Sequence, residues 1–160
     1  MPTMPAVFTR LLLIPLVVFA VCAGGCSTNI TDDDVDDAVI SLTKFKAEME
    51  QAKGNRLVIL DARSVEAYAA GHIPGAAHLP MTAIRSNEKE KDPRIDRYKL
   101  KVVYGENRAS SMARGLVKRL MAAGYGDVKF FAGGVEEWTR TGGELKPATG
   151  PVTPITRSVP

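Results

Sequence analysis

The stretch that decides the fold runs from residue 57 to residue 138 and contains four separate motifs. They are Leu60-Asp61-Ala62-Arg63, Gly71-His72-Ile73-Pro74-Gly75-Ala76, Val102-Val103-Tyr104 and Gly133-Gly134-Val135-Glu136-Glu137-Trp138. The continuous apolar run at 57–60 predicts a strand that is buried on both faces, and residues 102–104 and 128–131 are also expected to be strands. Helical segments and short loops separate these runs, so we expect a single α/β domain. Its sheet should be mostly parallel and doubly wound, with helices on both faces.

The longest amphipathic segment is expected to be a helix that begins at Ser110 or Ser111 and ends at Gly124. Its apolar residues recur at helical spacing and should face the core: Met112, Leu116, Leu120 and Met121. The other predicted elements are a helix capped by Ser41 and ending before Gly54, a brief helix capped by Ser64, a short strand at 77–79, a loop at 89–98 and a last helix at 135–139.

Together and in this order, the four motifs resemble the rhodanese-like family, and the resemblance covers residues 41–145. It implies an α/β domain in which an apolar strand ends in a nucleophilic cysteine that opens a short loop before a helix. In this chain the corresponding strand, 101–104, ends in Gly105. The only two cysteines are Cys22 and Cys26, which lie far upstream. The motifs therefore predict the fold, whereas the residue that the family's sulfur-transfer chemistry needs is not in its expected position.

The loop after this strand is the candidate binding site, and it reads Gly105-Glu106-Asn107-Arg108-Ala109-Ser110-Ser111. Backbone N–H groups at a strand end and helix N-terminus can converge on an anion, which the helix dipole also favours. We therefore expect weak binding of sulfate-like or phosphate-like anions, opposed by Glu106 and assisted by Arg108. Ser110 stands where the resemblance places the loop arginine. Because an unassisted serine is a poor nucleophile, Ser110 and Ser111 are interpreted as helix caps.

Four residues around the loop are expected to support it structurally. The resemblance pairs Asp61 with Arg63 as a salt bridge or hydrogen-bonded brace. His72 is assigned a structural role in the turn at 71–76, and Trp138 is expected to pack in the core beneath the loop. The only other histidine is His78, and two histidines six residues apart are weak evidence for a metal site. We predict no metal and no cofactor.

The first 25 residues have the features of a signal peptide. Arg10 precedes an apolar run at 11–21, which is shorter than the roughly 20 residues that a membrane-spanning helix needs. The sequence Ala23-Gly24-Gly25-Cys26 resembles a bacterial lipoprotein cleavage site, so Cys26 is the predicted lipidation site. An ordinary signal peptide cut near Ala23 or Gly25, and an uncleaved anchor, remain alternatives. The expected location is the extracytoplasmic side of the bacterial cell envelope, at the outer membrane if the cell has one.

Two segments outside the domain are expected to lack a packed structure. Residues 26–40 carry five aspartates and are interpreted as a lipidated N-terminus followed by an extended acidic linker. Fourteen residues at about 3.3 Å each would let this linker hold the domain up to roughly 45 Å from its anchor. Residues 146–160 are rich in proline and threonine, which predicts a flexible tail.

Charge argues against nucleic acid as a partner. The formal net charge is +3, both signs are spread through the body, and acidic residues dilute the basic stretch at 85–101. The first functional hypothesis is a membrane-tethered, non-catalytic module that binds a small oxyanion or a protein partner. The alternatives are a thiosulfate-type sulfurtransferase with an unrecognised or partner-supplied nucleophile, and an envelope structural protein. An assay with thiosulfate and cyanide separates the second hypothesis from the other two.

Overall fold

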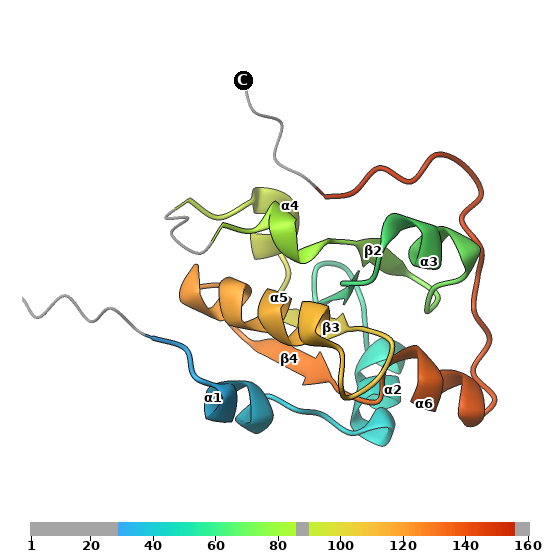
Figure 1. Ribbon diagram of the computed structural model, residues 1–160, viewed down its shortest axis with the longest axis horizontal. Coiled ribbons are helices and arrows are strands. Elements are labelled where there is room, and N and C mark those ends of the chain that lie inside the picture. The colour runs from blue at the N-terminus through green and yellow to red at the C-terminus, as the bar shows by residue number, and fades with distance from the viewer. Residues whose placement is uncertain (1–28, 86–89, 156–160) are drawn as a thin grey trace, which may run out of the picture.

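The computed structural model describes residues 29–85 and 90–155 and contains one parallel sheet (Figure 1). Its strands are β1 (Leu57–Asp61), β2 (Ala76–His78), β3 (Leu100–Tyr104) and β4 (Val128–Phe131). They lie in the order β2-β1-β3-β4, and every neighbouring pair is parallel. In the register, Asp61 lies opposite His78 on one side and opposite Tyr104 on the other. The carboxyl ends of β1, β2 and β3 therefore meet at one edge of the sheet.

Helices cover both faces of the sheet, so the prediction of a single α/β domain is confirmed. Alternate residues of a strand point to opposite faces. Leu60 and Val103 accordingly pack in one core cluster with α5 (Ser111–Ala122), the short helix α4 (Pro93–Asp96) and the 3-10 turn η1 (Met81–Ala83). Ile59 and Val102 pack in a second cluster with α2 (Leu42–Glu50) and α6 (Gly134–Arg140). The remaining helices are α1 (Asp32–Asp37) and α3 (Val65–Ala70).

The acidic N-terminal segment contains α1, so the prediction of an extended linker is wrong for the part that the structure describes. Thr31 and Asp34 form a reciprocal capping box at the start of α1. Val35 is fully buried in the core cluster around α5. Beyond α1, Phe130 N–H donates to Ala38 O at 2.9 Å, and Ile40 N–H donates to Phe130 O at 2.9 Å. This segment therefore covers the outer edge of β4.

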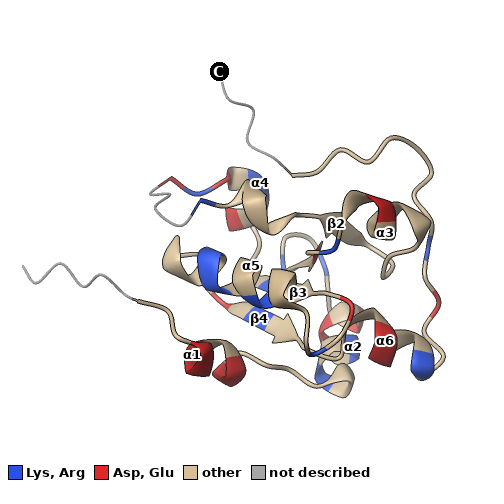
Figure 2. Ribbon diagram, in the orientation of Figure 1, with Lys and Arg blue, Asp and Glu red and all other residues tan. Residues whose placement is uncertain are grey.

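Ion pairs hold the acidic face of α1 against α5. Arg114 contacts Asp36 at 2.8 Å and Asp32 at 3.4 Å, and Lys118 contacts Asp32 at 3.0 Å. Figure 2 shows that α1 is largely acidic and that α5 carries basic residues. The aspartates that suggested a self-repelling chain are thus partly neutralised by a helix some eighty residues later.

The C-terminal segment also differs from the expected flexible tail. Residues 146–155 form no regular secondary structure, but they run beside α3 and β2 and are hydrogen-bonded to both (Figure 1). The backbones of His72 and Lys146 exchange hydrogen bonds of 3.0 and 2.9 Å. Further along, Ala148 N–H donates to Ala69 O, and Ile155 N–H donates to His78 O. We call residues 146–155 the C-terminal strap.

Three smaller predictions need correction. The loop expected at 89–98 contains α4, which is capped by Asp92 and buries Ile95. Met112, in the first turn of α5, is 42% exposed rather than in the core. The second strand lies one residue earlier than expected, at Ala76–His78. Within residues 29–85 and 90–155, no helix is long and apolar enough to cross a membrane.

Candidate functional site

The predicted loop connects β3 to α5 and contacts the start of α6. Val135 N–H donates to Gly105 O at 3.1 Å, and Glu136 N–H donates to Glu106 O at 3.0 Å. Gly134 makes this approach possible, because its φ is +58° and a Cβ there would lie 2.6 Å from Glu106 O. A side chain at Gly134 would therefore push α6 away from the loop.

Ser110 determines how much room there is at Gly105. It is the N-cap of α5, where its hydroxyl accepts a hydrogen bond from Ala113 N–H at 3.5 Å. A Cβ built on Gly105 would lie 2.6 Å from Ser110 Cβ and 2.9 Å from Ala113 Cβ, and closer still to Ser110 Oγ. Real Cβ atoms essentially never approach other heavy atoms so closely. The Ser110 side chain thus takes up the space that any side chain at Gly105 would enter.

Asn107 uses two of the loop amides that were expected to converge on an anion. Ala109 N–H donates to Asn107 Oδ1 at 3.0 Å, and Ser110 N–H donates to Asn107 O at 3.0 Å. The loop therefore forms a compact turn that is partly satisfied by its own atoms. The expectation of an open amide cradle is wrong for these two groups.

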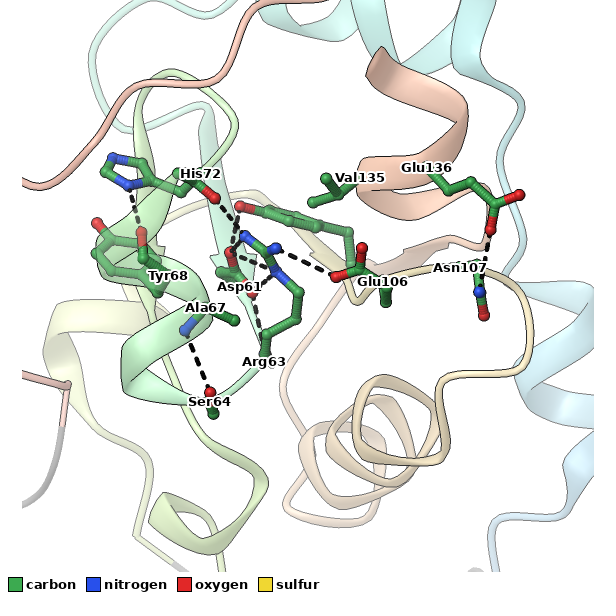
Figure 3. A network of polar contacts seen from close by, with 12 residues as sticks. Asp61, Arg63, Ser64, Ala67, Tyr68, His72, Glu106, Asn107, Val135 and Glu136 are labelled. Atoms are coloured by element: carbon green, nitrogen blue, oxygen red, sulfur yellow. Dashed lines mark hydrogen bonds and ion pairs between the residues drawn. The ribbon is translucent and has the colours of Figure 1, made fainter. Parts of the chain in front are cut away.

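A buried carboxylate lies beneath the loop (Figure 3). Asp61 is fully buried and accepts hydrogen bonds from Arg63 N–H at 2.9 Å and Arg63 Nη2 at 2.8 Å. It also accepts from the hydroxyl of Tyr104 at 2.6 Å, and that hydroxyl accepts from Ile73 N–H at 3.1 Å. Burial, together with the charge of Asp61, raises the pKa of Tyr104, which keeps the phenol protonated as a donor.

Arg63 links this buried carboxylate to the candidate loop. Its guanidinium donates to Gly71 O at 2.6 Å and contacts Glu106 Oε2 at 3.2 Å. Burial alone would lower the pKa of Arg63, but the hydrogen bond and charge of Asp61 raise it. The guanidinium therefore stays protonated. The charge of Glu106 is thus offset by Arg63, and not by Arg108 as the sequence suggested.

Beside the loop is an open hollow of about 420 Å³. It is lined by loop residues and by the first two turns of α6: Asn107, Arg108, Ala109, Gly133, Glu136, Glu137 and Arg140. Asn107 Nδ2 donates to Glu136 Oε2 at 3.0 Å, which joins the two walls. Within residues 29–85 and 90–155, neither Arg108 nor Arg140 has an ion-pair partner. Sequence reasoning missed Arg140, because nothing in its local pattern places it near the loop.

The other two residues predicted to support the loop, His72 and Trp138, do not contact it directly. His72 stacks on Tyr68, with ring centroids 4.0 Å apart, and its Nδ1 lies 3.1 Å from Tyr68 O (Figure 3). It therefore faces α3 rather than the loop. Trp138 is 8% exposed, packs against Phe45 and donates from Nε1 to Glu144 O at 3.0 Å. It holds α6 in place and reaches the loop only through that helix.

This fold, with its loop between β3 and α5, matches a known family over most of the chain. The family model described as "Rhodanese-like domain" matches residues 41–141, and the chain belongs to the rhodanese-like domain family. Thiosulfate sulfurtransferase GlpE from Pseudomonas putida is 36% identical over 93 residues, which cover 58% of this chain and 79% of that protein.

Two further comparisons define how far the similarity extends. The protein YrkF from Bacillus subtilis is 30% identical over 100 residues, and the chain spans only 50% of its length. The solution structure of the rhodanese-like domain of Alr3790 from Anabaena superposes with a TM-score of 0.51 at 25% identity. That superposition covers 76% of this chain and 90% of the other. The chain is therefore a rhodanese-like domain whose relatives include sulfurtransferases.

Proposed function

We propose that this domain is a non-catalytic binding module that has lost the sulfur-transfer step of its relatives. One observation carries the proposal: Ser110 and Ala113 fill the space beside Gly105 at the end of β3. Sulfur transfer needs a thiolate that can attack and then hold sulfane sulfur. The described part of the chain contains no cysteine. The nearest hydroxyl, that of Ser110, accepts the capping hydrogen bond of α5 and, among the described residues, has no general base as a hydrogen-bond partner.

The ligand that best fits the site is a small oxyanion, or the carboxylate of a protein partner, bound in the hollow beside the loop. Arg108 and Arg140 line that hollow and have no ion-pair partner in the described chain. Guanidinium groups recognise carboxylate and phosphate in a bidentate manner. Glu136 and Glu137 line the same hollow, so we expect weak affinity. The proposed anion site is thus formed by side chains between the loop and α6, Arg108 among them, and not by the loop amides.

The test combines an assay of turnover with an assay of binding. Incubation with thiosulfate and cyanide should give no thiocyanate above the buffer rate. Titration with millimolar sulfate or phosphate should shift the backbone amide signals of residues 107–109 and 136–140. Arg108→Ala and Arg140→Ala should each weaken binding severalfold, whereas Arg97→Ala, in an exposed turn elsewhere, should have no effect. Absence of any anion-induced shift, or equal affinity in all three variants, counts against the anion site.

A sulfurtransferase remains the second candidate, because GlpE proteins similar to this chain carry that name. Such an activity would need an unrecognised nucleophile or one supplied by a partner. Robust thiocyanate production by the purified protein would favour it and overturn the non-catalytic proposal. An envelope protein with a purely structural role would show neither turnover nor anion binding.

We also propose that the mature protein is tethered to the envelope by lipid on Cys26. The support is the sequence Ala23-Gly24-Gly25-Cys26 after an apolar run. The segment lies outside the described residues.

A further inference from the structure

A second hollow, of about 580 Å³, lies between the C-terminal strap and the edge of the sheet at β2. Its walls are Tyr68, His72, Ala76, Ala77 and His78 on the domain side and residues 146–153 on the strap side. Backbone hydrogen bonds to His72, Ala69 and His78 hold the strap against the domain on both sides of the hollow. Its volume is within the range of about 300–1,000 Å³ that is typical of small-molecule sites.

Three rings form one wall of this hollow. Tyr68 and His72 stack with an interplanar angle of 5°, and the His78 ring centroid lies 5.3 Å from that of Tyr68. The Tyr68 hydroxyl donates to Ala76 O at 2.8 Å, which fixes the central ring. Rings held in this way offer a rigid surface on which a planar molecule can stack at little cost in conformational entropy.

His78 lines this hollow and carries a buried, unsatisfied acceptor. Its Nε2 lies 2.9 Å from Arg63 O, and because a carbonyl oxygen only accepts, Nε2 carries the hydrogen. In the neutral ring Nδ1 is then an acceptor, and it has no hydrogen-bond partner in the described chain. The residue is only 4% exposed. A buried acceptor without a donor destabilises the free protein, so a ligand that supplies an O–H or N–H group to it would bind more tightly.

His72 and Lys146 add a second acceptor and a positive charge. His72 Nδ1 lies 3.1 Å from Tyr68 O, so it is the donor and leaves Nε2 as an acceptor. His72 and Lys146 are bridged in antiparallel register, which places their side chains on the same side of the chain pair. Lys146 has no ion-pair partner within residues 29–85 and 90–155. Its ammonium group is therefore available to an anionic ligand.

From these observations we infer that the hollow under the C-terminal strap binds a small planar aromatic acid that carries a hydrogen-bond donor. Its ring would stack on the Tyr68–His72 pair, its O–H or N–H would donate to a histidine nitrogen, and its carboxylate would pair with Lys146. Among the described residues, no group of three or more histidine, cysteine or acidic side chains could hold a metal ion, so an organic ligand suits the two histidines better. The site does not depend on the proposed function of the Gly105–Ser111 loop.

The probe for this site is 4-hydroxybenzoate, which carries a planar ring, an O–H donor and a carboxylate. Added to the intact protein, it should shift the amide signals of Tyr68, His72, His78 and residues 146–153. Benzoate, which lacks the donor, should bind about tenfold more weakly. The neutral analogue 4-hydroxybenzyl alcohol should also bind more weakly, because it cannot pair with Lys146.

Matched variants separate binding from folding. His78→Gln can keep an amide N–H for Arg63 O but loses the Nδ1 acceptor, His72→Phe keeps the stack but loses both nitrogens, and Lys146→Met keeps the length of the side chain but loses the charge. His78→Gln and Lys146→Met should each weaken 4-hydroxybenzoate binding about tenfold, and His72→Phe should weaken it less. Arg97→Ala, at the exposed C-cap of α4 and outside both hollows, should bind normally. No shift at the strap with millimolar 4-hydroxybenzoate, or unchanged affinity in His78→Gln and Lys146→Met, overturns the inference.

Discussion

The side chain of Ser110 caps α5 with its hydroxyl and also fills the space beside Gly105. A glycine at the end of β3 and a serine at the N-cap of α5 are therefore matched to each other. Restoring a cysteine at Gly105 alone would create overlap with Ser110 and Ala113 rather than an active site.

The first prediction concerns Gly105→Cys. Overpacking at this buried position should lower the free energy of unfolding by about 1–3 kcal/mol. The thiol should also label slowly, because Ser110 and Ala113 enclose it. Thermal denaturation and the pH dependence of thiol labelling measure the two effects.

The matched control is Gly105→Cys/Ser110→Gly. Removing the Ser110 side chain makes room for the thiol, whereas glycine at the N-cap costs only about a few tenths of a kcal/mol. The double variant should recover part of the lost stability and should label faster, with a more acidic thiol at the helix N-terminus. If Gly105→Cys is as stable as the parent and labels rapidly, Ser110 does not close this position.

The second prediction concerns the buried carboxylate beneath the loop. Tyr104→Phe removes the donor to Asp61 Oδ2 and the acceptor of Ile73 N–H. The loss should reduce the free energy of unfolding by about 1–3 kcal/mol, because two buried polar groups lose a partner. Urea denaturation measures the change. Tyr98→Phe, a control at a partly exposed tyrosine, should change stability by less than about 0.5 kcal/mol, and equal effects of the two variants would argue against a structural role for the network.

At the scale of an element, α1 is stabilised by groups that titrate at acid pH. Hydrogen bonds from Lys118 and Arg114 hold the pKa of Asp32 below its usual value of 3.8. The hydrogen bonds of Thr31 similarly lower the pKa of Asp34. A lowered pKa in the folded state means that these contacts contribute fully above pH 3.8 and are lost as the pH falls through the folded-state value.

The third prediction is therefore that acidification releases α1 before the sheet unfolds. As the pH falls below 3.8, the NMR methyl signals of the buried Val35 should move toward solvent-exposed positions while those of Val102 stay native. Arg114→Gln/Lys118→Gln should weaken the docking of α1 near neutral pH, by removing the partners of Asp32 and Asp36, and should lessen its response to acid. Simultaneous loss of the Val35 and Val102 signals at every pH would show that α1 is not a separate unit.

The elements that sequence reasoning predicted are those whose signals are local. The strands follow from continuous apolar runs, and Ser41, Ser64 and Ser110 mark helix starts through side-chain capping. By contrast, α1 carries one buried valine among five aspartates, and its partners Arg114 and Lys118 are distant in sequence. The C-terminal strap is held mainly by backbone hydrogen bonds, which leave no pattern in the side chains.

The same distinction holds for the candidate site. The position of the loop could be predicted, because parallel strands place their carboxyl ends at one edge of the sheet. The filling of the space beside Gly105 by Ser110 could not, because it depends on the path of the loop and the rotamer of one side chain. Arg140 could not be predicted either, since it joins the hollow only through the packing of α6 against the loop.

At the scale of the whole molecule, the fourth prediction tests the proposed anchor. Cys26→Ala should leave an unprocessed precursor or release the protein from the membrane fraction, because the lipid-bearing thiol is gone. Fractionation followed by mass determination of the N-terminus measures this. Processing and membrane association identical to those of the parent would show that Cys26 carries no lipid.

With lipid on Cys26, the docking of α1 would determine how far the domain stands from the bilayer. Only five residues separate Cys26 from Asp32, the first residue of α1, and the six residue-to-residue steps between them span at most about 20 Å. A released segment would instead reach the roughly 45 Å expected of an extended linker. The ion pairs between α1 and α5 would therefore determine the length of the tether between the lipid and the domain. With α1 docked and the tether short, the domain would meet chiefly molecules that lie on or in the same membrane.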